Sequence, residues 1–162
     1  GTYPLPEAQL DRFMFNLWVD YPTLKEEQQI VKNTTSAATQ GVSKVLNAQQ
    51  IATLQDLIRR VPVADNVVEY AVKLVRKTRP ASDEAPKFVK DYVSWGCGPR
   101  ASQYLILGAK TRAALHGRPT PEIDDVRAVA LPVLRHRLVP NFTAEADGIK
   151  TEHLVEKLLA EK

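Results

Sequence analysis

WGCGPRASQYL, residues 95–105, has the sequence of a helix start. Gly98 stands before Pro99, whose fixed φ suits the first helical position, and a long run of helix-forming residues follows. The pattern predicts a helix from Pro99 to a C-terminal cap at Gly117. Arg100 lies in the first turn of that helix, where the positive end of the helix dipole disfavours a cation by a few tenths to about 1 kcal/mol. Any account of this chain therefore has to explain Arg100.

Helical patterns flank this segment on both sides. Thr23 and Glu26 have the spacing of a capping box, and Asn47 and Asp65 are suited to cap two further helices. Pro132 is expected to kink or restart the helix in which it lies. The expected helices cover residues 7–13, 24–34, 48–61, 66–79, 99–116, 122–138 and 151–160, with a loop over 34–44 and an undecided segment at 87–95.

One segment reads as a strand. In FMFNLWVD, residues 13–20, large apolar side chains occupy both alternating sets of positions, which is typical of a strand covered on both faces. A lone strand is not stable and needs partners in a sheet, but the rest of the chain offers few candidates. The sequence therefore predicts a mainly α fold, a helical domain preceded by the end of a region that contains a sheet. Because the chain opens on Gly1 instead of methionine, we expect it to be either a piece of a longer polypeptide or a chain trimmed at its start.

Composition narrows the classes of protein. The 162 residues are 44% apolar, which supports a hydrophobic core and argues against disorder. The 22 basic and 19 acidic residues are well mixed, so binding to nucleic acid by charge alone is not indicated. No apolar run approaches the roughly 18 residues of a membrane span. The single Cys97 excludes an internal disulfide and favours a reducing compartment, so we expect a cytoplasmic protein.

Arg100 has two interpretations. It can pair on the surface with an acid such as Asp83 or Asp91, which is the ordinary situation of an exposed arginine. It can also bind an anion, because unpaired N–H groups and the helix dipole favour a phosphate at a helix start. Gly96 and Gly98 would then let the backbone approach the ligand closely.

Arg12 also has two interpretations. It follows a short predicted helix, where a cation is favoured and where the neighbouring Asp11 could hold it. The same position, just before the predicted strand, would let it reach a phosphate bound by a neighbouring subunit. Other chemistry is poorly supported: the three histidines and Cys97 have no metal-site or nucleophile spacing, and no phosphate loop occurs in these residues.

Four stretches resemble the MoxR family of AAA+ proteins. GTYPLPEAQLDRFMF (residues 1–15) resembles the end of the ATPase core of that family. VADNVVEYAVKLVRKTR (residues 63–79), VSWGCGPRASQYLILGAKTRAALHGR (residues 93–118) and DDVRAVALPVLRHRL (residues 124–138) resemble its helical lid. The resemblance covers essentially the whole chain, and implies a division into residues 1–22, the end of the core, and residues 23–162, the lid. Cys97 and Gly98 depart from the family pattern, which more often has a small residue and then Ser or Pro.

The resemblance implies roles for individual residues. Arg100, in GPRA, matches the sensor 2 arginine, which reaches from the lid to the phosphates of the nucleotide. Arg12, in LDRF, matches the arginine finger, which acts on ATP bound by the adjacent subunit. Tyr21 and Pro22 fall where such proteins often contact the base. The cofactors implied are ATP and magnesium, held mainly by a phosphate loop, an acidic motif and a sensor 1 residue that would precede Gly1. No metal ligand is expected among the present residues.

The family also implies a function. MoxR proteins are ring-forming ATPases, so we expect a ring, hexameric by resemblance, that remodels or activates client protein complexes, in some cases together with a protein that carries a von Willebrand factor A domain. These 162 residues alone are expected not to hydrolyse ATP. The alternative is a stand-alone helical adaptor or DNA-binding domain, in which Arg100 and residues 135–137 contact acids or phosphates. The predicted strand favours the lid, because an adaptor leaves that strand without a sheet.

Overall fold

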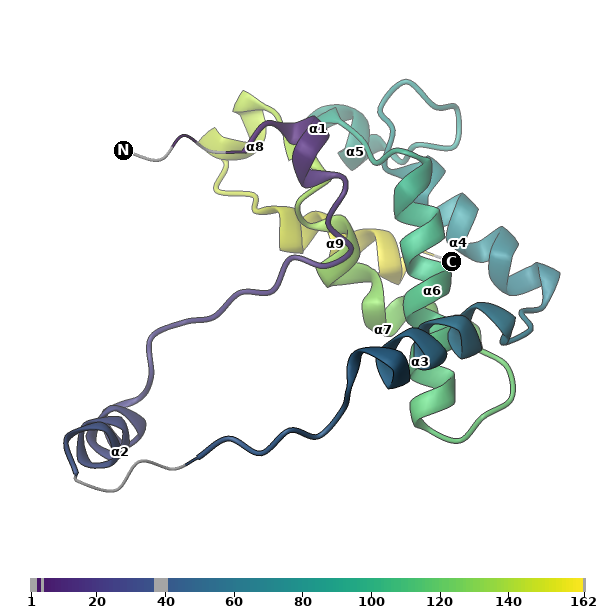
Figure 1. The fold of residues 1–162 in the computed structure, drawn as a ribbon. Coiled ribbons are helices and arrows are strands. Elements are labelled where there is room, and N and C mark those ends of the chain that lie inside the picture. Colours follow the sequence, from purple (N-terminus) through teal and green to yellow (C-terminus); the bar gives the residue numbers. More distant parts are fainter. Residues whose placement is uncertain (1–2, 4, 37–40, 162) are drawn as a thin grey trace.

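The computed structural model describes residues 3, 5–36 and 41–161, and it is mostly helical (Figure 1). The prediction of a mainly α fold is confirmed. The helices are α1 (Glu7–Leu10), α2 (Leu24–Thr35), α3 (Ala48–Arg60), α4 (Asp65–Lys77), α5 (Lys87–Tyr92), α6 (Pro99–Leu115), α7 (Ile123–Leu134), α8 (Phe142–Ala146) and α9 (Thr151–Ala160), and the strands are β1 (Val93–Trp95) and β2 (Val139–Pro140).

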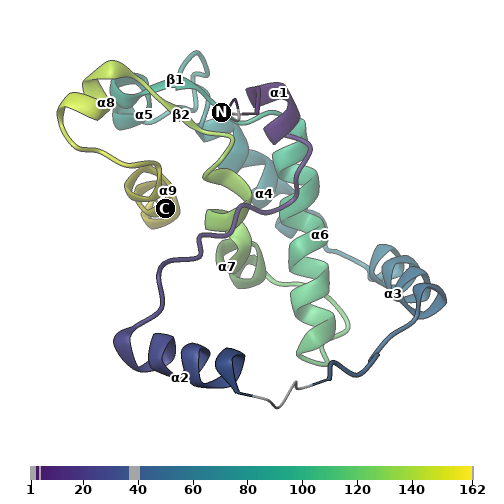
Figure 2. The same ribbon diagram turned by 60° about the vertical axis from the view of Figure 1, so that its left-hand side comes forward.

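The core is built around α6, which packs against both α4 and α7, while α9 lies on α7 (Figure 2). Gly108 of α6 lets α7 approach closely, because an added Cβ there would lie 3.2 Å from Val129. The buried residues of α6 recur at helical spacing: Ala101, Leu105, Gly108, Ala109 and Ala113. Leucines from three different helices, Leu105 of α6, Leu134 of α7, and Leu154 and Leu158 of α9, are among the largest fully buried side chains. The helical part therefore has a continuous apolar core.

Most predicted helix ends are observed. Gly98 is the N-cap of α6 with Pro99 at the first position, and Gly117, just beyond the helix, has the left-handed φ of 69° that favours glycine. Asn47 caps α3 by accepting the Gln50 N–H at 2.8 Å. Two starts differ from the prediction. Ala64, and not Asp65, is the N-cap of α4, and α7 begins at Ile123 and continues through Pro132 to Leu134.

The strand predicted over residues 13–20 is wrong. Residues 13 and 14 form a bend and residues 15–20 have no regular secondary structure, and the N–H of Asn16 donates to the Pro132 carbonyl of α7 at 2.9 Å. The physical reason is that no strand among the described residues lies beside them to complete a ladder. The only strand pair in the described chain is β1 with β2, antiparallel, in the segment that the sequence left undecided.

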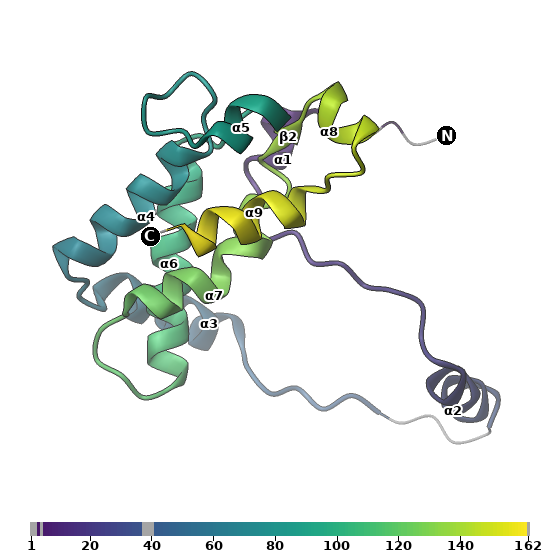
Figure 3. The ribbon, with the colours of Figure 1, turned by 180° about the vertical axis from the view of Figure 1, so that it is seen from behind.

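Helix α2 stands away from the other helices (Figures 1 and 3). The predicted capping box is present: the Thr23 N–H donates to the Glu26 carboxylate at 2.8 Å, and the Glu26 N–H donates to the Thr23 hydroxyl at 3.5 Å. Among the described residues, no helix combines the length and apolarity needed to cross a bilayer.

Candidate functional site

Arg100 lies at the start of α6, and its guanidinium is bound to a carboxylate near the N-terminus of the chain. Its Nη1 is 3.2 Å from Oδ2 of Asp11, which is 89 residues away in sequence. The expectation of pairing with Asp83 or Asp91 is therefore wrong, because the first segment of the chain folds back onto the start of α6. The side chain remains 47% exposed, so the ion pair leaves Arg100 accessible.

The glycines beside Arg100 have different environments. An added Cβ at Gly96 would lie 2.4 Å from the Thr78 carbonyl at the end of α4, whereas at Gly98 nothing lies within 4 Å. Gly96 is thus required by packing between β1 and α4, which is a structural role and not the ligand approach that we expected. Gly98 alone leaves open space at the helix start.

Arg12 follows α1 in a tight turn that hydrogen bonds and an aromatic side chain hold in place. The Arg12 N–H donates to the Gln9 carbonyl at 3.1 Å. The Tyr104 hydroxyl of α6 donates to the Arg12 carbonyl at 2.9 Å. The Arg12 side chain is exposed, and in the described part of the chain no carboxylate lies within ion-pair distance of it. The expected local pair with Asp11 does not form, because the Asp11 carboxylate is occupied by other arginines.

The second arginine on Asp11 is Arg137, just beyond the end of α7. Its side chain is 1% exposed, and its Nε lies 3.0 Å from Oδ1 of Asp11. Nη2 donates to the carbonyls of Asp11 at 2.8 Å and Phe13 at 2.5 Å. Nη1 donates to the carbonyl of Met14 at 3.4 Å and also to that of Val133 in α7. The guanidinium carbon lies 5.0 Å from the centre of the Tyr104 ring. Arg137 therefore binds residues 11–14 to the helical core.

His136 supports the same segment. Its Nε2 lies 3.0 Å from the Phe13 carbonyl. Burial lowers the pKa of His136, although the bond to Phe13 acts in the opposite direction. At neutral pH the ring is therefore uncharged and can donate one N–H to this carbonyl.

Sequence reasoning missed Arg137 as a site residue and named it only for the DNA-binding alternative. A signal was present. Arg137 lies four residues after Val133 and seven after Ala130, both fully buried, so it continues the apolar side of α7. A cation at such a position requires charged or carbonyl partners. Which partners it has depends on residues 11–14, far away in sequence.

Comparison with known proteins assigns the chain to a family. Residues 86–158 match the family described as AAA lid domain. The chain is 38% identical over 165 residues to the chaperone MoxR1 of Mycobacterium tuberculosis, a match that covers 98% of this chain and 42% of that protein. The chain belongs to the MoxR family of AAA+ proteins.

Other MoxR relatives agree. The protein MoxR of Methylorubrum extorquens is 30% identical over 148 residues, which cover 85% of this chain and 43% of that protein. The crystal structure of a candidate ATPase from Cytophaga hutchinsonii superposes with a TM-score of 0.90 and 29% identity, over 100% of this chain and 49% of that one. This MoxR-family chain therefore spans less than half the length of these relatives.

The remaining predicted residues of the MoxR chain lie elsewhere. Tyr21 is 94% exposed and adjoins α2, and its N–H donates to the Asp20 carboxylate at 2.8 Å. Pro22 is the next residue and is also exposed. Figures 1 and 3 show α2 far from the end of α6 that carries Arg100. Tyr21 and Pro22 therefore do not join Arg12 and Arg100 in one cluster within the described residues.

Metal and nucleophile chemistry are not supplied by the described part of the MoxR chain. It contains no group of three or more His, Cys, Asp or Glu residues that could hold a metal ion. Burial raises the pKa of Cys97 to about 12, despite the lowering effect of Thr78. Its thiol is thus protonated at neutral pH and is no nucleophile.

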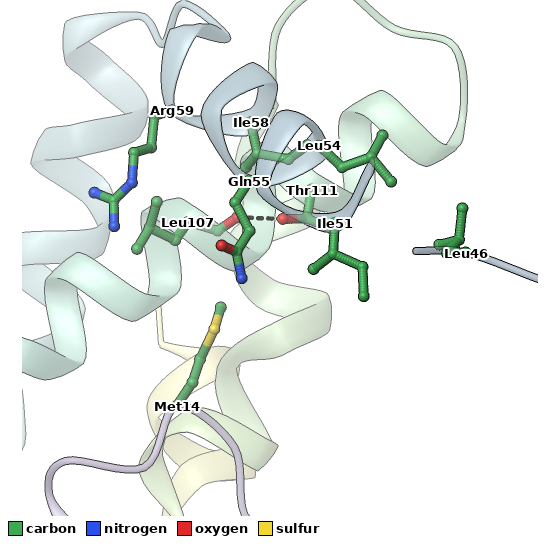
Figure 4. Close-up of a pocket in the computed structure, with 9 residues that line it drawn as sticks. All are labelled: Met14, Leu46, Ile51, Leu54, Gln55, Ile58, Arg59, Leu107 and Thr111. Carbon is green, nitrogen blue, oxygen red and sulfur yellow. Dashed lines mark hydrogen bonds between the residues drawn. The ribbon is translucent and has the colours of Figure 1, made fainter. Parts of the chain in front are cut away.

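A hollow of about 480 Å³ lies between α3 and α6, with Met14 at its edge (Figure 4). Arg59 is the only charged side chain among the described residues that line it; the others are Met14, Leu46, Ile51, Leu54, Gln55, Ile58, Leu107 and Thr111. Such a lining suits apolar side chains and not a phosphate. The candidate site is therefore Asp11 with the two arginines bound to it, Arg100 and Arg137, and the adjacent exposed Arg12.

Proposed function

We propose that this chain is the part of a MoxR-type ATPase that follows its phosphate-binding core. Residues 1–22 would be the end of that core and residues 23–162 the helical lid. The observation that carries the proposal is that Arg100, in the first turn of α6, is bound to Asp11, the residue next to the exposed Arg12.

Arg100 is proposed as the sensor 2 residue. The first turn of α6 already offers backbone N–H groups and the positive end of a helix dipole, and Arg100 adds a full positive charge. Without nucleotide, Asp11 offsets this charge at 3.2 Å. Phosphate oxygens would compete with Asp11 for the guanidinium, so the position of the lid would depend on the nucleotide. Phosphate binding would thus explain why a cation lies at a helix start, where the dipole disfavours it.

Arg12 is proposed as the arginine finger. Its backbone is held on both sides by hydrogen bonds while its side chain is exposed. A fixed backbone with an accessible guanidinium suits a residue that stabilises charge on a phosphoryl group in a neighbouring subunit. Exposure of Tyr21 likewise suits the proposed contact of Tyr21 and Pro22 with the base.

The wider proposals follow from the family. ATP would be the substrate, and magnesium would be held by residues outside this chain, since the described residues form no metal-binding group. The whole protein would assemble as a ring, hexameric by resemblance, and would remodel client complexes in the cytoplasm, with a von Willebrand factor A domain protein as one kind of partner. These 162 residues alone would not turn over ATP.

The alternative, a DNA-binding or adaptor domain, has less support. It relies on residues 135–137 as a basic surface, but the side chains of Arg135 and Arg137 are 14% and 1% exposed. Buried guanidinium groups cannot contact phosphates of a duplex.

The test is ATP hydrolysis by the full-length protein with Arg12→Ala or Arg100→Ala. We expect each change to lower kcat at least about tenfold, since an arginine finger contributes about 10³–10⁵ in other nucleotide hydrolases. Arg127→Ala is the matched control, because Arg127 is an exposed arginine of α7 whose Nη1 donates to the Tyr70 hydroxyl at 3.2 Å. Unchanged hydrolysis in both site variants would refute the proposal.

A further inference from the structure

We propose that Arg137 is the positioning residue for Arg12, and that it keeps Arg12 attached to the lid while Arg100 exchanges Asp11 for a phosphate. The inference rests on the proposed roles of Arg12 and Arg100. Residues 11–14 are called the finger segment here.

The finger segment is a turn with no strand beside it among the described residues. Backbone carbonyls that leave water require hydrogen-bond donors, and a turn outside a helix or sheet has to find them in other parts of the chain. Here the Arg137 guanidinium donates to the carbonyls of Asp11, Phe13 and Met14. One side chain therefore supplies donors to three of the four residues of the segment that carries Arg12. The planar guanidinium, with five N–H donors, is suited to this, whereas a lysine ammonium offers three donors from one point.

The two carboxylate oxygens of Asp11 bind different arginines. Oδ1 is bound to Arg137, whose side chain is 1% exposed, and Oδ2 is bound to Arg100, whose side chain is 47% exposed. The buried contact is protected from water and salt, and the exposed contact exchanges more easily. Departure of Arg100 toward a phosphate would therefore leave the Asp11–Arg137 contact in place.

The other contacts of the finger segment also involve helices α6 and α7. Tyr104 of α6 donates to the Arg12 carbonyl and stacks below the Arg137 guanidinium. The N–H of Arg137 in turn donates to the Leu134 carbonyl at the end of α7. Arg12 is thus attached to α7 and to α6, the helix that carries Arg100. Movement of the lid driven by Arg100 in one subunit would be transmitted to the arginine offered to the next subunit.

Hydrogen exchange tests the attachment in this 162-residue chain and needs no catalytic activity. Arg137→Met removes the donors at similar length, and we expect the amides of Arg12, Phe13 and Asn16 to exchange at least about tenfold faster. Arg137→Lys should give an intermediate rate, and Arg127→Met is the control, with exchange unchanged. Unaltered exchange at these amides in a folded Arg137→Met protein would overturn the inference. If Arg137→Met does not fold, Arg137→Lys, which offers fewer donors from one point, is measured in its place, and unaltered exchange there has the same meaning.

Mixed rings separate positioning from a general structural role. In the full-length protein, Arg137→Met should lower kcat with KM for ATP unchanged. It should regain hydrolysis when mixed with subunits that lack the phosphate-loop lysine, because those subunits supply an intact finger. Arg100→Ala, which acts on its own subunit's nucleotide, should not be rescued.

These experiments distinguish failure of the proposed function from failure of the positioning role of Arg137. If Arg12→Ala is not rescued in mixed rings, the proposed function is wrong, while hydrogen exchange still decides the role of Arg137. If Arg12→Ala is rescued but Arg137→Met is either fully active alone or not rescued, the positioning role is wrong and the proposed function stands.

Discussion

Asp125 provides the most quantitative test of how the helical part is held together. Its side chain is 2% exposed and lies in the first turn of α7. The Nη1 and Nη2 atoms of Arg118 donate to its Oδ2 and Oδ1 at 2.7 and 2.5 Å, and Nε of Arg112 lies 3.1 Å from Oδ1. It also accepts the Glu122 N–H at 2.9 Å. We therefore examine Asp125→Asn, which keeps the shape and removes the charge.

The expected loss follows from these contacts. A hydrogen bond to a charged group contributes about 1.5–3 kcal/mol. An asparagine oxygen can still accept the Glu122 N–H but cannot bind two guanidinium groups. Both arginines are partly exposed, at 33% and 44%, and regain water when released, which reduces the loss. We expect the free energy of unfolding to fall by about 2–3 kcal/mol at pH 7, a large part of the roughly 5–15 kcal/mol of a typical domain.

The pH dependence has a definite sign. The bond to Arg118 lowers the pKa of Asp125, against the raising effect of burial. A lowered folded pKa means that the carboxylate stabilises the fold above its unfolded pKa of about 3.9 and that this contribution is lost as pH falls through the folded pKa. The difference between the unmodified protein and Asp125→Asn should therefore be full at pH 7 and shrink in acid.

Urea unfolding of the 162-residue chain at pH 7 and at several acidic values measures both effects. Asp124→Asn is the control, because Asp124 lies in the same first turn but is exposed. This change should remove only its interaction with the helix dipole and should lower the free energy of unfolding by about 0.3–1 kcal/mol. A loss below about 0.5 kcal/mol for Asp125→Asn, or a difference that stays constant into acid, would refute this reasoning.

Three further predictions concern packing and reactivity. Gly96→Ala should destabilise the protein by about 1–3 kcal/mol, because the new Cβ would lie 2.4 Å from the Thr78 carbonyl, and urea unfolding beside Gly98→Ala, with open space, checks this. Leu105→Ala should cost about 2–5 kcal/mol, since Leu105 is fully buried in the core; a loss under about 1 kcal/mol would contradict the packing described. Cys97 should react with a thiol reagent at pH 8 only after unfolding, because burial raises its pKa to about 12, and rapid labelling of the native protein would disagree.

Features of the fold with local causes were predictable. The capping box at Thr23 and the cap at Asn47 involve residues three positions apart, and both are observed. The last helix, α9, has the predicted bounds because its apolar residues repeat within one helix. The start of α6 followed from Gly98 and Pro99. Each of these depends on contacts within about one turn of helix.

The predictions that were wrong or incomplete concern contacts between residues far apart in the sequence. The apolar pattern of residues 13–20 predicts a strand, but a strand forms only beside another strand. Asp11 and Arg137 are 126 residues apart, so nothing near either residue identifies its partner. For the same reason Arg12 and Arg100 could be named from resemblance but not connected through Asp11. The sequence therefore suggested Arg12 and Arg100 as members of the candidate site, and the structure added Arg137 and the contacts with Asp11.

The measurement that tests the central claim most directly is ATP hydrolysis by mixed rings of the full-length protein. Subunits with Arg12→Ala are mixed in increasing proportion with subunits that lack the phosphate-loop lysine. The account predicts that each is inactive alone and that mixing restores turnover, because Arg12 acts on the nucleotide of the adjacent subunit. Normal hydrolysis by Arg12→Ala alone, in protein that still assembles, would contradict the account and leave Arg12 as an ordinary cation at a helix end.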